Sequence, residues 1–173
     1  MHINPYGEDP VRFAISLAVD FPVSPAGLVA RCRAAGVEVP AGDVDLDDVR
    51  LFVDEWLGVV DAPDDKTRAE RLNVLLAAAS AYPRLTNHAS DGWHLHYRAA
   101  ELPLAGVLRA LISVGTALHL TGRGMHRLGR CAVTECGRPF ADVSRTGRQR
   151  YCSPACANRD AVRRHRAGAA AAT

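Results

Sequence analysis

Apolar residues recur at helical spacing in three stretches of the first half of the chain. The first stretch, residues 25–35, lies between Ser24, which is typical of a helix start when Pro25 follows it, and Gly36, which is typical of a helix end. The second stretch follows Asp45 and covers residues 46–60, and the third covers residues 66–81. The spacing and the terminal residues predict three helices.

The pattern changes to alternation after residue 82. Residues 84–88 and 93–97 lie on either side of the turn sequence Ser90-Asp91-Gly92. Two alternating segments around such a turn predict a β-hairpin. His94 and His96 are two positions apart, so on a strand they share one face.

Residues 104–120 are almost wholly apolar, and we expect them to form the central core helix, ended by Gly122-Arg123-Gly124. The wider apolar stretch, residues 102–120, is interrupted by Pro103, Arg109 and His119 and is too short and too polar for a membrane span. The first 124 residues thus predict a mostly helical domain with one hairpin.

The last third of the chain is rich in turns. Residues 139–143 and 149–151 predict two short strands that pair around residues 144–148, with Phe140 and Tyr151 as a small core. Residues 153–154, Ser-Pro, then predict the start of a helix that Gly168 ends, and we expect residues 169–173 to be a disordered, Ala-rich tail.

Charge is unevenly spread along the chain. The net charge is +2, but residues 123–173 hold 11 of the 21 basic residues and 3 of the 19 acids. A basic segment behind an acidic one indicates a module that binds a polyanion. The Arg and Ala richness is typical of a bacterial genome of high GC content.

Four cysteines lie within 26 residues of one another, spaced Cys131-x4-Cys136-x15-Cys152-x3-Cys156. Two close pairs separated by about 15 residues are typical of a closed structural zinc site, because each pair bends around one ion and four thiolates leave no place for water. Gly137-Arg138 fits a knuckle turn after the first pair. A knuckle, a hairpin and a helix that carries Cys156 resemble the treble-clef arrangement.

Three other interpretations of the cysteines stay open: a pair of disulfides, four unrelated buried thiols and an iron–sulfur cluster. The first residues lack the basic region and apolar run of a signal peptide, so we expect a cytoplasmic protein, in which disulfides are rare. An iron–sulfur cluster favours a different spacing. Cys32 stands apart from the four, and we expect it to be a small buried residue.

The predicted last helix carries basic residues on one face, since Arg159, Arg163 and Arg166 are spaced i, i+4 and i+7. Arginines contact phosphates and read guanine edges, whereas a run of charge also suits a solvated helix face. Asp160 is the one acid of this helix, and we expect it to pair with Arg163 or Arg164. The candidate nucleic-acid contacts are Arg145, Arg148, Arg150, Asn158, Arg159, Arg163, Arg164 and Arg166.

The run Cys156-Ala157-Asn158-Arg159 and its Arg-rich tail resemble the CGNR zinc finger, named for Cys-Gly-Asn-Arg at the fourth ligand. Asp142-Val143-Ser144-Arg145 and Arg150-Tyr151-Cys152-Ser153 fit the same pattern. The resemblance implies that the four cysteines bind zinc and that Asn158 and Arg159 are motif residues. Ala157 replaces the Gly of the family, a change that a helix tolerates.

The N-terminal part is similar to the ABATE domain, which precedes this finger in proteins described as stress-induced transcription regulators. The resemblance rests on residues 17–21, 72–73, 83–85 and 94–97. It implies an ABATE-like helical domain over residues 1–124 and a CGNR-type zinc finger over residues 125–168. The fold class expected is mainly α with a β-hairpin, a helical N-terminal domain plus a small treble-clef-like zinc finger.

We therefore expect a zinc-dependent DNA-binding protein that regulates transcription, with an N-terminal domain that senses a small molecule or forms a homodimer. The alternative is a ligand-binding or enzymatic N-terminal domain with a purely structural or protein-interaction finger. His88, His94, His96 and Asp91 are its best candidates for chemistry. We expect no enzyme, because the sequence has no phosphate loop, dinucleotide fingerprint or nucleophile elbow.

Overall fold

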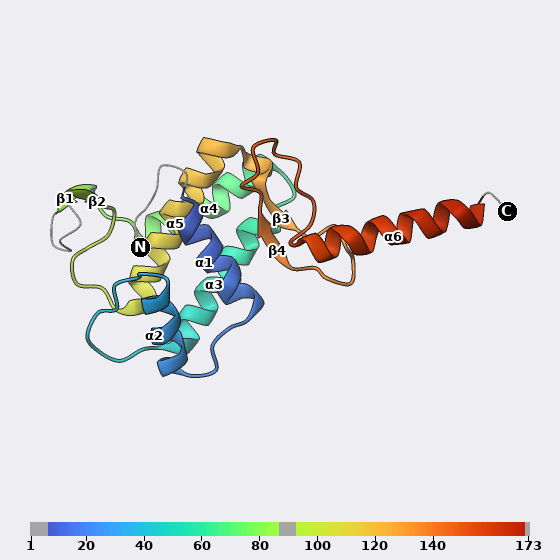
Figure 1. Cartoon of the computed structure of the whole chain (residues 1–173). Helices are drawn as coiled ribbons and strands as arrows, with labels where there is room; N and C mark the ends of the chain where they lie inside the picture. Colours follow the sequence, from blue (N-terminus) through green and yellow to red (C-terminus); the bar gives the residue numbers. More distant parts are fainter. Residues whose placement is uncertain (1–6, 87–92, 172–173) are drawn as a thin grey trace.

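The computed structural model of the protein describes residues 7–86 and 93–171, without the side chains of His94 and residues 169–171. It shows a helical body, followed by a small module from which the last helix projects (Figure 1). The fold is mainly α, as predicted. The elements are α1 (Glu8–Val19), α2 (Pro25–Ala34), α3 (Leu46–Val60), α4 (Asp65–Ala79), β1 (Arg84–Thr86), β2 (His94–His96), α5 (Leu104–Arg123), the 3-10 helix η1 (Met125–Arg127), β3 (Leu128–Arg130), β4 (Pro139–Ala141) and α6 (Pro154–Ala171).

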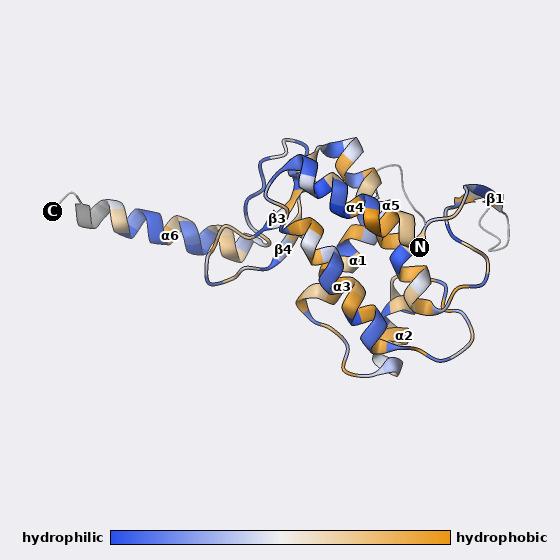
Figure 2. Cartoon of the chain, turned by 180° about the vertical axis from the view of Figure 1, so that it is seen from behind, coloured by the Kyte–Doolittle hydropathy of each residue, from blue (hydrophilic) through white to orange (hydrophobic). Residues whose placement is uncertain are grey.

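Helix α5 is the core of the body, with α1, α3 and α4 packed around it. Leu108 and Ile112 are fully buried. The helix is long and apolar enough to cross a membrane by length and composition, but 67% of its most apolar window is buried inside the protein. That burial is typical of a core helix. Figure 2 shows the contrast with α6, which is largely hydrophilic along its length.

The caps predicted for α2 and α3 are present. The Ser24 hydroxyl accepts a hydrogen bond from the N–H of Gly27 at 3.2 Å, and the Asp45 carboxylate accepts from the N–H groups of Asp47 and Asp48 at 2.9 and 3.0 Å. These bonds satisfy N–H groups that the first turn of a helix leaves without partners. The three helices expected between residues 25 and 81 are confirmed.

Helix α1 has no counterpart among the elements that the sequence pattern predicted. It packs against α5, where Gly7 and Gly115 let the two backbones approach closely: a Cβ on Gly115 would lie 2.4 Å from the Cβ of Pro10. The outer side of α1 faces β4. This helix thus joins the core of the body to the C-terminal module.

The predicted hairpin is confirmed as the pair β1 and β2, which is antiparallel with Leu85 opposite Leu95. His96 lies in β2, half-buried, and the backbone of His94 lies in the same strand. His88 and Asp91, proposed with them as candidates for chemistry, lie outside the described residues. Of the four candidates, only His96 has a described side chain.

The second predicted hairpin is wrong in its pairing. Strand β4 pairs with β3, so that Gly129 lies opposite Phe140, whereas residues 149–151 form no strand. The backbone of the predicted partner strand makes other hydrogen bonds. The N–H of Gln149 donates to the Asp142 carboxylate at 2.9 Å, and the Arg150 carbonyl accepts from the N–H of Ala132 at 2.8 Å.

The predicted end of the last helix at Gly168 is also wrong, because α6 continues through this residue to Ala171. The expected disordered tail, residues 169–173, is therefore helical over residues 169–171. Gly168 does not have the positive φ of a helix-ending glycine. The alanines that follow are the best helix formers, which favours continuation.

The body and the module pack directly together. Arg130 donates both ends of its guanidinium to the Asp61 carboxylate, each at 2.7 Å. Arg123 at the end of α5 donates to the Val143 carbonyl at 3.2 Å. The prediction that no long linker separates the two parts is confirmed.

Candidate metal centre

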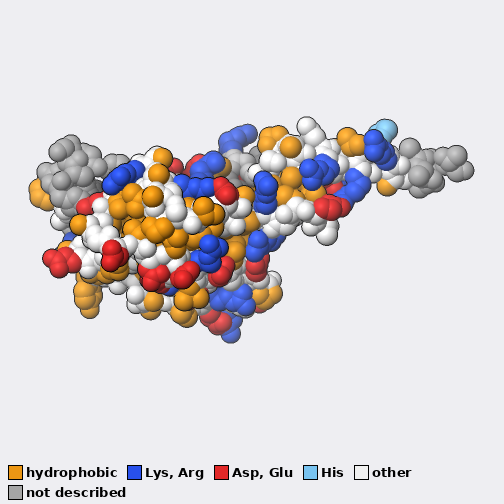
Figure 3. Space-filling view, turned by 90° about the horizontal axis from the view of Figure 1, so that it is seen from below, with side chains coloured by type: hydrophobic (Ala, Val, Ile, Leu, Met, Phe, Trp, Pro, Cys, Tyr) orange, Lys and Arg blue, Asp and Glu red, His pale blue; other side chains and the backbone are white. Residues whose placement is uncertain are grey.

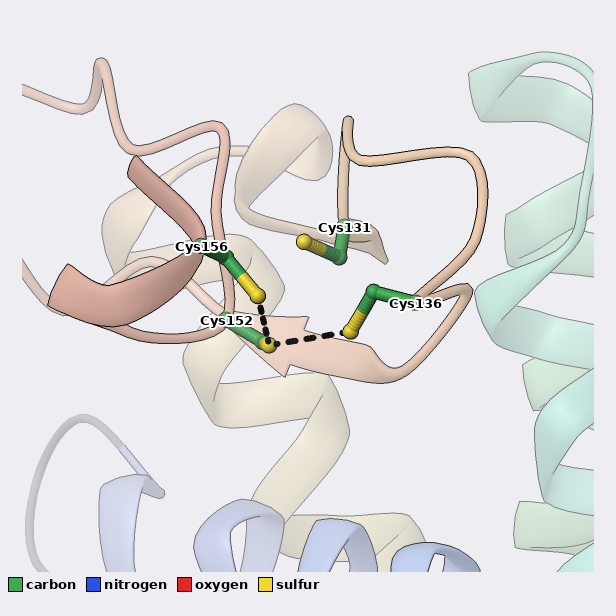
Figure 4. Close-up of side chains that lie close together, drawn as sticks. All are labelled: Cys131, Cys136, Cys152 and Cys156. Atoms are coloured by element: carbon green, nitrogen blue, oxygen red, sulfur yellow. Dashed lines mark hydrogen bonds between the residues drawn. The ribbon is translucent and has the colours of Figure 1, made fainter. Parts of the chain in front are cut away.

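Four cysteines from three places in the chain converge on one point (Figure 4). Cys131 directly follows β3, and Cys136 lies in the turn before β4. Cys152 lies just before α6, and Cys156 lies in the first turn of that helix. The site therefore connects the β3–β4 pair to the base of α6.

The four sulfur atoms all lie within 4.8 Å of one another. The sulfurs of Cys136 and Cys152 are 3.6 Å apart, and those of Cys152 and Cys156 are 3.7 Å apart. Sulfurs about 2.3 Å from a central zinc ion, arranged as a tetrahedron, would be about 3.8 Å apart. The four cysteines thus have the spacing of a tetrahedral metal site.

The distances exclude two of the other interpretations of the cluster, a pair of disulfides and four unrelated thiols. A disulfide needs two sulfurs about 2 Å apart, and all five cysteines are free. Four unrelated thiols would not converge on one centre. Cys32 lies apart in α2, is fully buried, and has its pKa raised to about 11 by that burial, as its expected structural role requires.

The first cysteine pair is held by a tight turn. The N–H groups of Cys136 and Gly137 donate to the Val133 carbonyl at 2.9 and 3.3 Å, and Cys131 N–H donates to the Arg138 carbonyl at 2.9 Å. Gly137 has a φ of 56°, which favours glycine. The knuckle predicted at Gly137-Arg138 is confirmed.

The second pair is held by the helix start. The Ser153 hydroxyl accepts from the N–H of Cys156 at 3.3 Å, and the Ser153 carbonyl accepts from Ala157 at 3.1 Å. Ala157, the position at which the CGNR motif has Gly, lies inside α6. The predicted start at Ser153-Pro154 is thus confirmed.

The core of the finger differs from the one predicted. Val133, only 1% exposed, forms a cluster with Cys131 and Cys156, and Tyr151 packs against it. Phe140 is buried as well, but it lies in β4, which faces α1. Val133 is the one large apolar residue between Cys131 and Cys136, and this position could have identified it in the sequence as a core residue of the finger.

The thiols influence one another. The pKa of Cys136 is lowered to about 7, because the backbone N–H of Arg138 and the neighbouring thiols donate hydrogen bonds to its sulfur. Burial and hydrogen bonds with the other three thiols raise the pKa of Cys152 to about 12. Four sulfurs this close do not all ionise by themselves, whereas a cation at their centre favours four thiolates.

The donor set fits a metal that prefers sulfur. Thiolates bind zinc and iron, and four of them in a tetrahedron leave no coordination position for water or substrate. A metal held here by Cys131, Cys136, Cys152 and Cys156 would therefore stabilise the fold and would not act as a Lewis acid.

The candidate basic contacts lie on two parts of the finger. On α6, Asn158, Arg159, Arg163, Arg164 and Arg166 are all exposed, and Figure 3 shows basic side chains spread along this helix. Asp160 pairs with both predicted partners, at 2.6 Å from Arg163 and 3.0 Å from Arg164. The other candidates, Arg145, Arg148 and Arg150, are exposed on the loop after β4.

Asp160 also connects α6 to the finger core. The residue is only 8% exposed, and its carboxylate accepts a hydrogen bond from the Tyr151 hydroxyl at 2.7 Å. The hydrogen bond from Tyr151 and those from the two arginines lower the pKa of this carboxyl. The acid therefore fixes the second turn of α6 to the metal-binding half of the module.

Comparisons with known proteins agree with the geometry. No curated protein matches the chain. Residues 127–168, which include the four cysteines and most of α6, match the family model described as the CGNR zinc finger. The C-terminal module is thus similar to a CGNR zinc finger, with its four cysteines placed to bind a metal ion.

Proposed function

We propose that the protein binds DNA through α6 and the neighbouring loop of a zinc-bound finger, and that it regulates transcription. The helical body, which we propose to be an ABATE-like domain, would sense a signal or form a dimer. One observation carries the proposal: α6 starts at the four sulfurs and projects from the body with exposed arginines (Figure 1).

Zinc, when bound, supplies a rigid tetrahedral link between the knuckle and the first turn of α6. Residues of the chain itself hold the following turn of the helix. Asp160 and Tyr151 fix the next turn of the helix to the finger core. A helix held this way presents its side chains in a fixed direction, which lowers the entropy lost on binding.

The arginines of α6 differ in their availability. Arg163 and Arg164 are partly neutralised by Asp160. Arg159 and Arg166 are exposed and have no ion-pair partner among residues 7–86 and 93–171. Unpaired arginines attract phosphates without first losing a contact, so we expect Arg159 and Arg166 to contribute most to binding.

The test is a titration of duplex DNA with the zinc-loaded protein at several salt concentrations. We expect Arg159→Gln with Arg166→Gln to weaken binding at least tenfold and to reduce the slope of log K against log salt by about 2, since each phosphate contact adds about 0.9. The matched control is Arg33→Gln with Lys66→Gln, which removes the same charge from exposed positions of the body and should leave the slope unchanged.

Two results would count against the proposal. Wild-type protein with zinc bound that shows no salt-dependent binding would exclude a DNA-binding role. Equal losses in the finger variant and in the body variant would show that overall charge, and not α6, is responsible. Tighter binding of RNA than of duplex DNA would change the class of nucleic acid.

A second function has support from one feature of the structure. A cleft of about 550 Å³ lies between α1 and the finger, with Arg12, Arg31 and Gln149 on its walls and Phe140 among its apolar residues. Such a mixed lining suits a small organic anion. In this alternative the body binds a ligand and the finger is structural, and the DNA titration separates the two because the alternative predicts no binding.

A further inference from the structure

The loop after β4, residues 142–150, is folded around a buried acid. Asp142 is only 2% exposed, although it lies in a strongly basic module. A buried carboxylate is unfavourable unless it accepts hydrogen bonds or faces a positive charge. This one has both.

Asp142 closes the loop by accepting three hydrogen bonds. One carboxylate oxygen accepts from the N–H of Ser144 at 2.8 Å and from its hydroxyl at 2.6 Å. The other oxygen accepts from the N–H of Gln149 at 2.9 Å, seven residues along the chain. The Ser144 hydroxyl in turn accepts from Gly147 at 3.2 Å. Both ends of the loop are therefore held by a single side chain.

Two arginines near the end of α5 attach the loop to the body. Arg127 lies 3.5 Å from the Asp142 carboxylate and donates to the Ser144 carbonyl at 2.6 Å, and Arg123 donates to the Val143 carbonyl. Gly147, with a φ of 69°, lies directly on the Arg127 guanidinium: a Cβ there would be 2.6 Å from its central carbon. A larger residue would push the Arg127 guanidinium aside and would be strained by the positive φ.

The same loop presents its remaining charges outward. Arg145, Arg148 and Arg150 are exposed, and none has an ion-pair partner within the described ranges. Without the bonds to Asp142, this segment has no regular secondary structure to keep it in place. The arginines would then lose a fixed position, and binding would have to order the loop.

We propose that Asp142 is a positioning residue for DNA binding. It holds the loop after β4 in place as a second phosphate-contacting arm beside α6. The inference rests on the proposed function. It concerns a buried acid that reaches no ligand itself and acts through three arginines. It also assigns Arg127, which is 12% exposed as a side chain, to the support of the arm and not to DNA.

The direction in which DNA affinity changes on removal of Asp142 tests the inference. Removing an acid from a basic module strengthens its general attraction for DNA. Loss of a positioning acid should instead weaken binding. We expect Asp142→Ala to weaken duplex binding about tenfold. The matched control is Glu135→Ala, which removes the same charge from an exposed position of the finger and frees Arg163 from an ion pair at 3.5 Å, so binding should be unchanged or tighter.

A double-mutant cycle separates positioning from general damage. In protein that already carries Arg145→Gln, Arg148→Gln and Arg150→Gln, Asp142→Ala should change the affinity less than twofold, because the residues through which it acts are gone. A loss of the same size in both backgrounds would overturn the inference. Amide exchange of Gln149 should also become faster in Asp142→Ala, since this N–H loses its acceptor.

Zinc stoichiometry checks that each variant is folded. If Asp142→Ala loses zinc, Ser144→Ala decides: it removes one bond to the carboxylate, and it should weaken binding at full zinc content. Unchanged binding by zinc-loaded Ser144→Ala, or tighter binding by zinc-loaded Asp142→Ala, would overturn the positioning role. Wild-type protein that fails to bind DNA would instead exclude the proposed function, so the two failures are distinct.

Discussion

Arg68 illustrates how single buried polar residues organise the helical body. Its Nε and one terminal nitrogen donate to the carbonyls of Val59 and Val60, each at 3.2 Å, and its other terminal nitrogen donates to the carbonyl of Met125. The first two carbonyls end α3 and have no partners within the helix. One side chain thus caps a helix and holds η1, the segment that leads into the finger.

His119 is a second buried polar residue at this junction. It is fully buried, its Nε2 lies 3.3 Å from the Arg127 carbonyl, and its Nδ1 has no hydrogen-bond partner among the described residues. Burial lowers its pKa, and the charges of Arg123 and Arg127 act in the same direction, against the Arg127 carbonyl and Glu8. The folded state therefore keeps this imidazole neutral.

We predict that His119 makes the protein less stable in mild acid. The unfolded chain takes up a proton on this histidine as the pH falls through about 6.5, whereas the folded chain takes it up at lower pH, so stability falls below about pH 6.5. Between pH 6.5 and 5.5 the contribution is up to about 1 kcal/mol. Urea unfolding should show a smaller decrease for His119→Gln than for wild type. Equal decreases in the two proteins would contradict the prediction.

At the scale of elements, the contact between α1 and α5 depends on Gly115. A Cβ there would lie 2.4 Å from Pro10, so we expect Gly115→Ala to reduce the free energy of unfolding by about 1–3 kcal/mol. Gly58 in α3 has no atom within 4 Å of the same position, and Gly58→Ala should stabilise by up to about 1 kcal/mol. Urea unfolding of both variants checks the opposite signs.

Elements with their own terminal residues were predictable from the sequence. Ser24 and Asp45 mark the starts of α2 and α3, and the structure uses both as caps. Helix α1 was missed because Gly7 in its N-cap position offers no side-chain hydrogen bond. What identifies this helix is its packing against Gly115, a contact about a hundred residues along the chain that local pattern does not report.

The candidate metal site was predictable because its signal is local in the sequence, whereas the pairing of β4 depends on hydrogen bonds between distant residues. The positions of Cys131, Cys136, Cys152 and Cys156 follow from their spacing, since close pairs constrain the backbone locally. The partner of β4 is decided by competition: Asp142 takes the N–H of Gln149, and this leaves β3 as the strand that pairs. The sequence shows Asp142 but does not show which N–H and O–H groups donate to its carboxylate.

For the whole molecule, a large helical core supports a finger with a very small core of its own. Trp56 is fully buried in the body and donates to Thr116 at 3.0 Å. The finger cluster has three buried residues, of which two are cysteines. A module this small would depend on a bound metal for its stability, whereas the body, with its own large core, would not.

We therefore predict that metal removal unfolds one part and leaves the other intact. Chelator under reducing conditions should remove the contribution of α6 from the helical signal in circular dichroism. In protein that carries Trp93→Phe, which removes the exposed tryptophan, the fluorescence of buried Trp56 should stay unshifted. Cys152→Ser should have the same effect without chelator. Cys32→Ser, which alters a buried cysteine of the body, should keep the full metal content. A shifted tryptophan emission on chelation would show that the two parts unfold together.

The outward course of α6 has a consequence for how a partner is found. Beyond Asp160 its side chains are exposed through Gly168, and an isolated helical segment of this length is marginal in water. Its stability therefore depends on the first two turns, which Asp160 and the cysteines hold, and the 11 residues beyond Asp160 extend about 16 Å into solvent. A basic segment that reaches this far meets an anionic surface before the body does, so the gain is in the rate of encounter.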